Sequence, residues 1–427
     1  MRPSWADLRP GLALAALTVA AAGCGGGHQT PVQPSSTPTA AQRSGGDRAP
    51  SDRELIQALL DRRARALERG AARAYAATSA NGARAAAARA DARRARPLGL
   101  RDVRQGIDRL DLHGRRARAH VVTAWGIRGV RGTFRTERRI LLRRTRGGWR
   151  IAGTLGRRGL APWEVAAYTR RDERHFVVLV PSGVDIDAAG LPASLQDGYA
   201  RFATTLPRAH LRRRYLVVVA STAAGANRLT EDIRGVETLS AVADTAVREE
   251  GPAQRVTKVL SQRLLVVWPA FSGLGFDERR RVVAHELTHL VLAGATSGRT
   301  PSWLVEGIAL YVSGDRRSDQ VTAILRGLAG AEGVAARPAL SLRRLSAPNA
   351  IARLSGARQA GAYAYASAAA FAIADRYGRR ALLRLYDAFD DPGLPGKGGA
   401  TLTSRALRRT IGVGLAAFER DLRAGLS

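Results

Sequence analysis

The segment from Asp277 to Gly294 constrains the fold of this chain more than any other part of the sequence. Its apolar residues recur at helical spacing, which predicts an amphipathic helix whose apolar stripe faces a core. These residues are Val283, Leu287, Leu290 and Val291. Asp277 is expected to cap the helix and Gly294 to end it.

The same segment carries two histidines, His285 and His289, at positions i and i+4. This spacing places both rings on one face of the helix, where two imidazole nitrogens can reach one zinc ion. Glu286 lies one residue further round the helix and can reach a zinc-bound water without binding the metal. The three residues form the H-E-x-x-H arrangement.

A catalytic zinc site needs a third protein ligand and an open position for water. No histidine follows His289, and no acidic residue lies between His289 and Glu306. Glu306 is therefore the first candidate for the third ligand. The single methionine, Met1, excludes sites that need a methionine elsewhere in the chain.

Glu306 lies within the stretch Trp303–Tyr311, which reads W-L-x-E-G-x-A-x-Y. H-E-x-x-H followed by this stretch resembles the gluzincins, specifically the bacterial peptidase MA-like zinc metallopeptidases. The resemblance runs from about Arg174 to the C-terminus. It implies a thermolysin-like zincin domain with one zinc ion held by His285, His289 and Glu306, and with Glu286 as the general base.

The resemblance also implies a catalytic tyrosine. The stretch from Ala362 to Gly378 is similar to the helix that carries this residue in many gluzincins, and counting back from Gly378 points to Tyr363. Tyr365 is a close rival, and Ala366 stands where the family usually has glycine. A phenol at this position would donate a hydrogen bond to the oxyanion of a tetrahedral intermediate.

The N-terminus is typical of an export signal, with Arg2 and Arg9 ahead of an apolar stretch at 11–22. It ends at Cys24, which is the single cysteine and is followed by three glycines. This resembles a bacterial lipobox, although Ala21 stands where leucine is usual. The resemblance implies that residues 1–24 are a lipoprotein signal and that lipidated Cys24 anchors the chain in the cell membrane, facing outside the cytoplasm. Residues 25–50 are rich in Gly, Pro, Ser and Thr and are predicted to form a disordered linker.

Residues 51–158 are predicted to form an α+β domain, with helices first and an antiparallel meander afterwards. Ser51 and Asp52 are the candidates for the first helix cap, and Arg-rich and Ala-rich helical sequence continues to about Arg96. The strands are expected at Ile107–Leu112, Ala117–Ile127, Gly132–Arg143 and Trp149–Leu155. The stretch Arg143–Ile151 resembles the last hairpin of NTF2-like cone domains, so this domain is predicted to be NTF2-like.

Residues 162–427 are predicted to form a second α+β domain, the zincin domain, with a small mixed sheet followed by mostly helical sequence after Asp277. Its strands are expected at the apolar runs Phe176–Pro181, Tyr215–Ala220 and Leu264–Pro269, and a helix at Leu195–Leu206. We expect Leu264–Pro269 to be the edge strand, to which the backbone of a substrate would add.

The chain of 427 residues carries 68 Lys and Arg against 36 Asp and Glu, a formal net charge of +32. Two of these cations are the lysines Lys258 and Lys397, so the other 66 are arginines, spread along the chain. This pattern indicates a GC-rich coding bias, and a nucleic acid is not expected as a partner. Attraction to an anionic envelope surface is the better interpretation of the charge.

Together these features predict a membrane-tethered, extracytoplasmic zinc metallopeptidase that acts on peptide or protein substrates. An endopeptidase is favoured, because the G-x-M-E-N segment of related aminopeptidases needs a methionine that this chain lacks. The alternative from another class is a non-catalytic envelope lipoprotein that binds a ligand or an anionic polymer on the same scaffold.

Overall fold

The computed structural model describes residues 49–156, 158–207, 211–231, 233, 235–236, 239–251, 254–316, 340–394, 396 and 398–425. The predicted signal at 1–24, its Cys24 and nearly all of the linker at 25–50 lie outside these residues. Among the helices that the structure describes, none combines the length and apolar character needed to cross a membrane.

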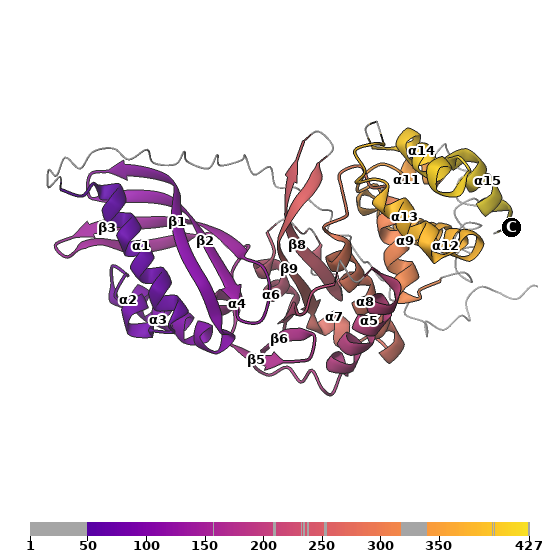
Figure 1. The fold of residues 1–427 in the computed structure, drawn as a ribbon. Coiled ribbons are helices and arrows are strands. Elements are labelled where there is room, and N and C mark those ends of the chain that lie inside the picture. The colour runs from indigo at the N-terminus through magenta and orange to yellow at the C-terminus, as the bar shows by residue number, and fades with distance from the viewer. Residues whose placement is uncertain are drawn as a thin grey trace, which may run out of the picture.

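The first part of the chain is a four-stranded antiparallel meander in the order β1-β2-β3-β4, with three helices beside it (Figure 1). Its elements are α1 (Asp52–Glu68), α2 (Ala72–Ala76), α3 (Gly82–Ala95), a 3-10 turn (Arg96–Leu98), β1 (Leu100–His113), β2 (Arg116–Ile127), β3 (Phe134–Thr145) and β4 (Gly148–Leu155). The four predicted strands are confirmed, although β1 begins earlier than predicted and β3 begins at Phe134 instead of Gly132. The identity of this part as an NTF2-like domain stays a prediction.

Helix α1 begins as the sequence predicts. Ser51 is its N-cap, because the Ser51 side chain accepts a hydrogen bond from the Glu54 N–H and the Glu54 carboxylate accepts one from the Ser51 N–H. The inner face of α1 buries Ile56, Leu59 and Leu60 against the alternate, inward-facing side chains of the sheet.

The second part of the chain begins with a mixed five-stranded sheet in the order β5-β6-β7-β9-β8. Its strands and the helices between them are α4 (Pro162–Val165), β5 (Tyr168–Asp172), β6 (Phe176–Pro181), α5 (Leu191–Thr205), β7 (Tyr215–Ala220), α6 (Ala223–Leu229), β8 (Ala241–Glu250), β9 (Arg255–Val267) and α7 (Trp268–Ser272). Strand β7 is parallel to both β6 and β9, whereas β5 and β8 run antiparallel to their neighbours.

The prediction that Leu264–Pro269 forms the edge strand is wrong. These residues belong to the end of β9, which pairs with β7 on one side and β8 on the other, and the chain turns into α7 at Trp268. A continuous apolar run marks a strand that is covered on both faces, and such strands lie inside a sheet. The edges of this sheet are β5 and β8, and β8, the edge beside β9, has a sequence that alternates less clearly.

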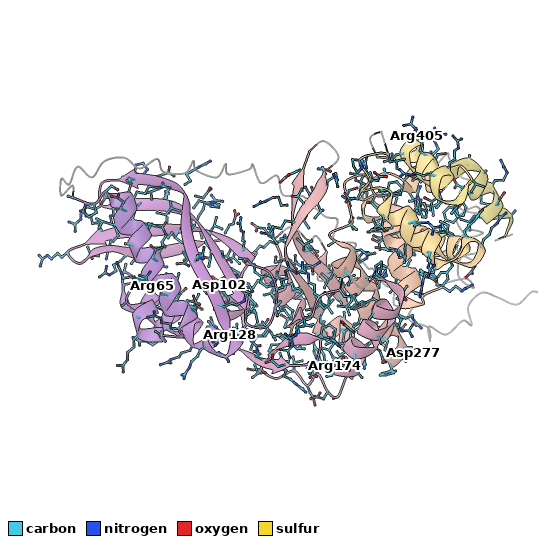
Figure 2. All side chains as sticks on the ribbon, in the orientation of Figure 1. Arg65, Asp102, Arg128, Arg174, Asp277 and Arg405 are labelled. Atoms are coloured by element: carbon cyan, nitrogen blue, oxygen red, sulfur yellow. The ribbon has the colours of Figure 1, made fainter. Side chains whose placement is uncertain are left out.

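The chain then becomes helical, as predicted, and the helices stack on one side of the second sheet (Figure 1). They are α8 (Phe276–Leu292), α9 (Ser302–Ser313), α11 (Leu342–Leu345), a 3-10 turn (Ile351–Arg353), α12 (Gly356–Tyr377), α13 (Arg379–Asp387), α14 (Ala400–Ile411) and α15 (Leu415–Ala424). The arginines labelled in Figure 2 lie on elements from both ends of the described chain, in keeping with the dispersed charge.

Asp277 is not the cap of α8. The N-cap is Gly275, whose N–H is bound by the Glu278 carboxylate at 2.9 Å, so Asp277 lies in the first turn. An acidic residue there still favours the helix through its dipole.

Two glycines let helices approach α8 and α9 closely. A Cβ on Gly198 of α5 would lie 2.8 Å from Val283 Cγ1 on α8, and a Cβ on Gly307 of α9 would lie 2.6 Å from the Ala366 carbonyl oxygen on α12. Neither distance leaves room for a methyl group. Since Gly307 directly follows Glu306, the spacing of α9 and α12 also sets the position of that carboxylate.

We expect Gly307→Ala to lower the free energy of unfolding by about 1–3 kcal/mol, because the added methyl group forces α9 and α12 apart. Gly82→Ala in α3 is the matched control: its Cβ would meet no atom within 4 Å, so the change should be neutral or stabilise by about 0.4–1 kcal/mol. Urea unfolding followed by circular dichroism measures both, and equal stability of Gly307→Ala and the parent would show that this contact imposes no constraint.

Candidate metal centre

Helix α8 brings three polar side chains into the protein interior. Its apolar stripe is buried against α5 and the second sheet, which leaves the His285, Glu286 and His289 side chains on the faces toward β8 and α9. His285 and Glu286 are 2% and 1% exposed. Polar groups buried to this degree need hydrogen bonds or a metal ion to offset the loss of hydration.

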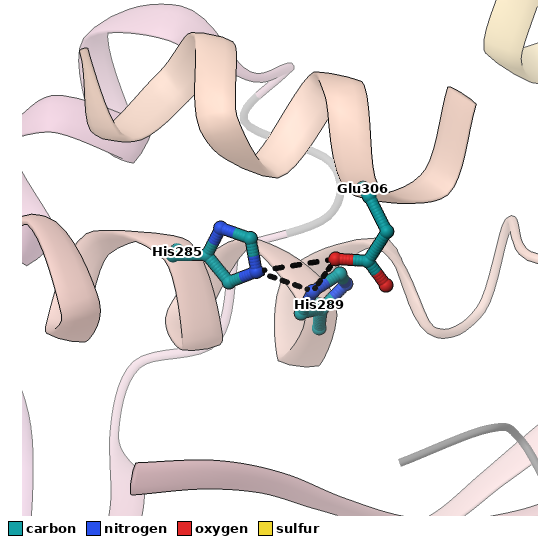
Figure 3. A group of neighbouring side chains, drawn as sticks. All are labelled: His285, His289 and Glu306. Carbon is teal, nitrogen blue, oxygen red and sulfur yellow. Dashed lines mark hydrogen bonds and ion pairs between the residues drawn. The ribbon is translucent and has the colours of Figure 1, made fainter. Parts of the chain in front are cut away.

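The structure brings His285, His289 and Glu306 together (Figure 3). The two Nε2 atoms lie 3.0 Å apart, and Glu306 Oε2 lies 3.3 Å from His285 Nε2 and 3.5 Å from His289 Nε2. Both histidines come from α8, and Glu306 reaches them from α9, which packs directly on α8. The sequence placed these three residues in one site, and the structure places them in contact.

The three atoms have the separations that zinc requires. Zinc–ligand bonds of about 2.1 Å at tetrahedral angles hold neighbouring ligand atoms about 3.4 Å apart. Two imidazoles and one carboxylate are a donor set that zinc accepts in catalytic sites. Glu306 is 1% exposed, and its Oε1 has no hydrogen-bond partner among the described residues. A cation fits this group better than a set of ordinary hydrogen bonds does.

The electrostatics of the group favour a bound cation as well. Burial alone would raise the pKa of Glu306, but His289 and His285 beside it lower that pKa to about 2. For His289, burial alone would lower the pKa, and the Glu306 carboxylate raises it above its usual value. Ligand side chains must lose their protons to bind a metal ion, so a cation would compete with protons for this group.

Glu286 is held by the edge strand. Its Oε2 accepts a hydrogen bond of 2.8 Å from the N–H of Ala243 in β8, whereas its Oε1 is buried and has no hydrogen-bond partner among the described residues. Burial raises the pKa of Glu286 to about 8, although His289 and the Ala243 N–H act in the opposite direction. A divalent cation at the neighbouring ligands would act in the same direction as these two groups. It would lower the pKa of Glu286, because it favours the charged carboxylate.

A cavity of about 570 Å³ opens on this site. Glu286, His289 and Glu306 line it together with β8 from Ala243 to Val247, and it continues to the start of β3 in the first sheet. The candidate site is therefore connected to a space large enough for several residues of a peptide.

The two candidate tyrosines lie on α12 and are both 1% exposed. The Tyr365 hydroxyl donates to Glu419 Oε1 at 3.0 Å, and Arg423 lies over its ring, so Tyr365 is used to attach α15 to α12. Tyr363 packs in the main core, and neither tyrosine is among the residues that line the cavity. The assignment of Tyr363 as the oxyanion donor stays a prediction.

Arg299 supports the loop between α8 and α9. It is 6% exposed, and its guanidinium group donates to the carbonyl oxygens of Phe389, Asp391 and Leu394 at 2.7–3.1 Å. It thereby ties the loop that joins the two ligand-bearing helices to the segment after α13. No pattern in the sequence distinguishes this arginine from the other 65.

Two further contributors were missed in the sequence. The Ala243 N–H is a backbone group of a strand that the sequence did not reveal, and the far wall of the cavity comes from β3, more than a hundred residues before α8. One sequence signal for this strand was available. In the stretch 241–250, Val242 and Ala243 precede a more polar run that ends at Gly251 and Pro252, a pair typical of a turn.

No family model matches this chain, and no curated protein matches it. Solved structures that resemble it include two crystal structures of a mutant M1 zinc metallopeptidase from Deinococcus radiodurans, one of them bound to a Tyr-Ser-Ala substrate. The identities are 14% and 16%, the TM-scores are 0.32 and 0.31, and each match covers 78% of this chain and 62% of the other. This chain therefore matches less than two thirds of their length. Because the TM-scores are below 0.5, functional inference depends on the geometry of the site.

We expect Glu306→Ala to lower zinc affinity by more than about tenfold, since changes outside the ligand shell already cost this much. Zinc at about a thousand times its dissociation constant should stabilise the parent by about 4 kcal/mol and the variant far less. Metal analysis after dialysis and thermal unfolding with and without zinc measure both effects.

The control for this prediction is Asp277→Ala, an exposed position in the first turn of the same helix. It should keep the zinc content and the zinc-dependent stabilisation of the parent. Unchanged zinc affinity in Glu306→Ala would remove Glu306 from the ligand set.

Proposed function

We propose that this protein is a zinc metallopeptidase that hydrolyses peptide bonds, most of them internal. The observation that carries the proposal is the position of Glu286, whose buried Oε1 has no hydrogen-bond partner among the described residues and which lies beside the group of His285, His289 and Glu306 that fits zinc. A site that only stored zinc would not need a buried acid beside the metal, because burying the acid costs desolvation free energy.

The edge of β8 suits an extended peptide. Ala243 pairs in register with Leu264, yet its N–H is donated to Glu286 and so points away from β9. In an antiparallel ladder alternate residues face outward, so Ala243 and Thr245 turn their backbone groups to the open edge. A substrate can add there as a further strand, with its scissile bond close to Glu286. The cavity follows β8 from Ala243 to Glu249, roughly 20 Å of strand at about 3.4 Å per residue, which supports cleavage within a chain.

In the proposed reaction, different residues of this chain bind the metal and transfer the proton. The chemistry supplied by zinc in such a site is Lewis acidity, which polarises a carbonyl group and makes water more acidic. His285, His289 and Glu306 would hold the ion. Glu286 Oε1 accepts the proton of the attacking water and returns it to the leaving amine, while Oε2 stays on the Ala243 N–H and fixes the carboxylate. Burial excludes bulk water from this transfer.

Glu286→Gln should reduce hydrolysis by at least about a hundredfold, because the amide cannot accept the proton. Zinc content should not change, since Glu286 is not a ligand in this arrangement. Cleavage of a quenched fluorescent peptide or casein, with metal analysis of the same sample, tests both statements, and Asp277→Asn serves as the control on the same helix. Full activity of Glu286→Gln would refute this mechanism.

The tyrosine prediction is tested by a pair of variants. If Tyr363 donates to the oxyanion, Tyr363→Phe should lower kcat by about a hundredfold with little change in KM. Tyr365→Phe should leave kcat unchanged and lower the free energy of unfolding by about 1 kcal/mol, because it removes the bond to Glu419. The opposite pattern would assign the role to Tyr365, and unchanged kcat in both would remove the tyrosine from the mechanism.

We further propose that the protein acts outside the cytoplasm, tethered to the cell membrane through a lipid on Cys24. The support for this is the signal-like sequence at 1–24 and the polar linker that follows it. The alternative of a non-catalytic envelope lipoprotein has less support, because it gives no reason for the buried carboxylate of Glu286.

A further inference from the structure

The first sheet forms one wall of the cavity that contains the candidate metal centre. Residues 133–137, at the start of β3, line the cavity opposite α8. They are fixed in place because the Thr133 N–H donates to the Leu260 carbonyl oxygen of β9 at 2.9 Å, while Arg101 donates to the carbonyl oxygen of Val130 at 2.8 Å. The two sheets are therefore joined at the cavity.

The faces of β8 show which substrate side chains would meet this wall. Ala243 belongs to the core cluster around α8, whereas its neighbour Asp244 points to the opposite face and pairs with Arg263 at 2.6 Å. A peptide added to the β8 edge alternates in the same way. Every second side chain of the substrate would thus face the first sheet and not the metal.

The charge of this part of the cavity is opposite to that of the chain. The sequence has 68 basic residues against 36 acidic ones, yet away from the metal centre the lining has four acidic residues and two arginines. They are Glu137, Glu231, Asp244, Glu249, Arg135 and Arg263. The same cavity also contains Glu286 and Glu306, both 1% exposed and each with a carboxylate oxygen that has no hydrogen-bond partner among the described residues.

We propose that this cleft selects peptide substrates that carry a lysine or arginine side chain near the scissile bond, and that Glu137 of β3 is a specificity-determining residue. Asp244 already has Arg263 as its partner, whereas the Glu137 side chain is 40% exposed and its one ion pair among the described residues is with His120 Nε2, at 3.5 Å. A carboxylate in this position gains most from a cation brought by the substrate. The proposal depends on the peptidase function proposed above.

The test uses the full-length, zinc-loaded protein and pairs of quenched fluorescent peptides. The members of each pair differ in one residue, arginine or the neutral isostere citrulline, at each of three positions on either side of the scissile bond. At one position or more, the arginine peptide should be cleaved with a kcat/KM about tenfold higher at low salt, and the ratio should fall as salt screens the pairing.

Glu137→Gln should lower that ratio to about twofold through KM, with kcat unchanged, and Glu137→Asp should restore part of it. The matched control is Glu250→Gln, which removes the same charge from β8 at a position outside the cavity lining and should keep the parent ratio. A ratio unchanged by Glu137→Gln, or equally lowered by Glu250→Gln, would overturn the role of Glu137.

Binding of the same peptides to the Glu286→Gln variant, followed by fluorescence anisotropy, separates this inference from the peptidase function. Tighter binding of arginine peptides without any cleavage by the parent would refute the peptidase function and keep the charge selection. Equal cleavage and equal binding of both members at every position would refute the charge selection and leave the peptidase function intact.

Discussion

The buried contact of Glu306 with two imidazoles is the interaction on which the rest of the site depends. A carboxylate that is 1% exposed is costly to bury unless positive charge lies against it, and the His285 and His289 rings supply the ligand atoms that a cation needs. This contact requires α8 and α9 to lie at a fixed distance. Gly198 lets α5 pack closely on α8, Gly307 lets α12 pack closely on α9, and Arg299 holds the loop that joins α8 to α9.

The same contact explains why the edge strand matters. Helix α8 presents its ligands on one side and Glu286 on the next, and the strand that binds Glu286 also lines the cavity together with His289 and Glu306. One backbone N–H, that of Ala243, thereby aligns the acid with the open edge where a peptide can add. In the proposed function, the orientation of the acid and the binding of the substrate both depend on this strand.

The sequence predicted the parts of this structure that are local and missed those that depend on distant neighbours. The spacing of His285, Glu286 and His289 follows from one helix. Glu306 was predicted as the third ligand because it is the first acidic residue after His289 and no histidine follows. The strand β8 was missed because its sequence alternates weakly and its conformation is set by pairing with β9. The run at Leu264–Pro269 was assigned to the edge, since an apolar run reports burial but not which strands lie beside it. The packing of β3 against β9 leaves no sequence signal, because only the folded chain brings them together.

Some of the many arginines have a structural role that the composition did not suggest. Arg299, Arg138 and Arg263 are each less than a tenth exposed and donate to backbone carbonyl oxygens, so they behave as fixed donors inside the fold.

The hydrogen bond from the Thr133 N–H to the Leu260 carbonyl oxygen has a consequence for engineering of this protein. A cut between the two sheets would release the β3 wall and Glu137 with it. A truncated second half would keep the metal ligands, and under the proposed function the entrance to its site would be wider and less selective.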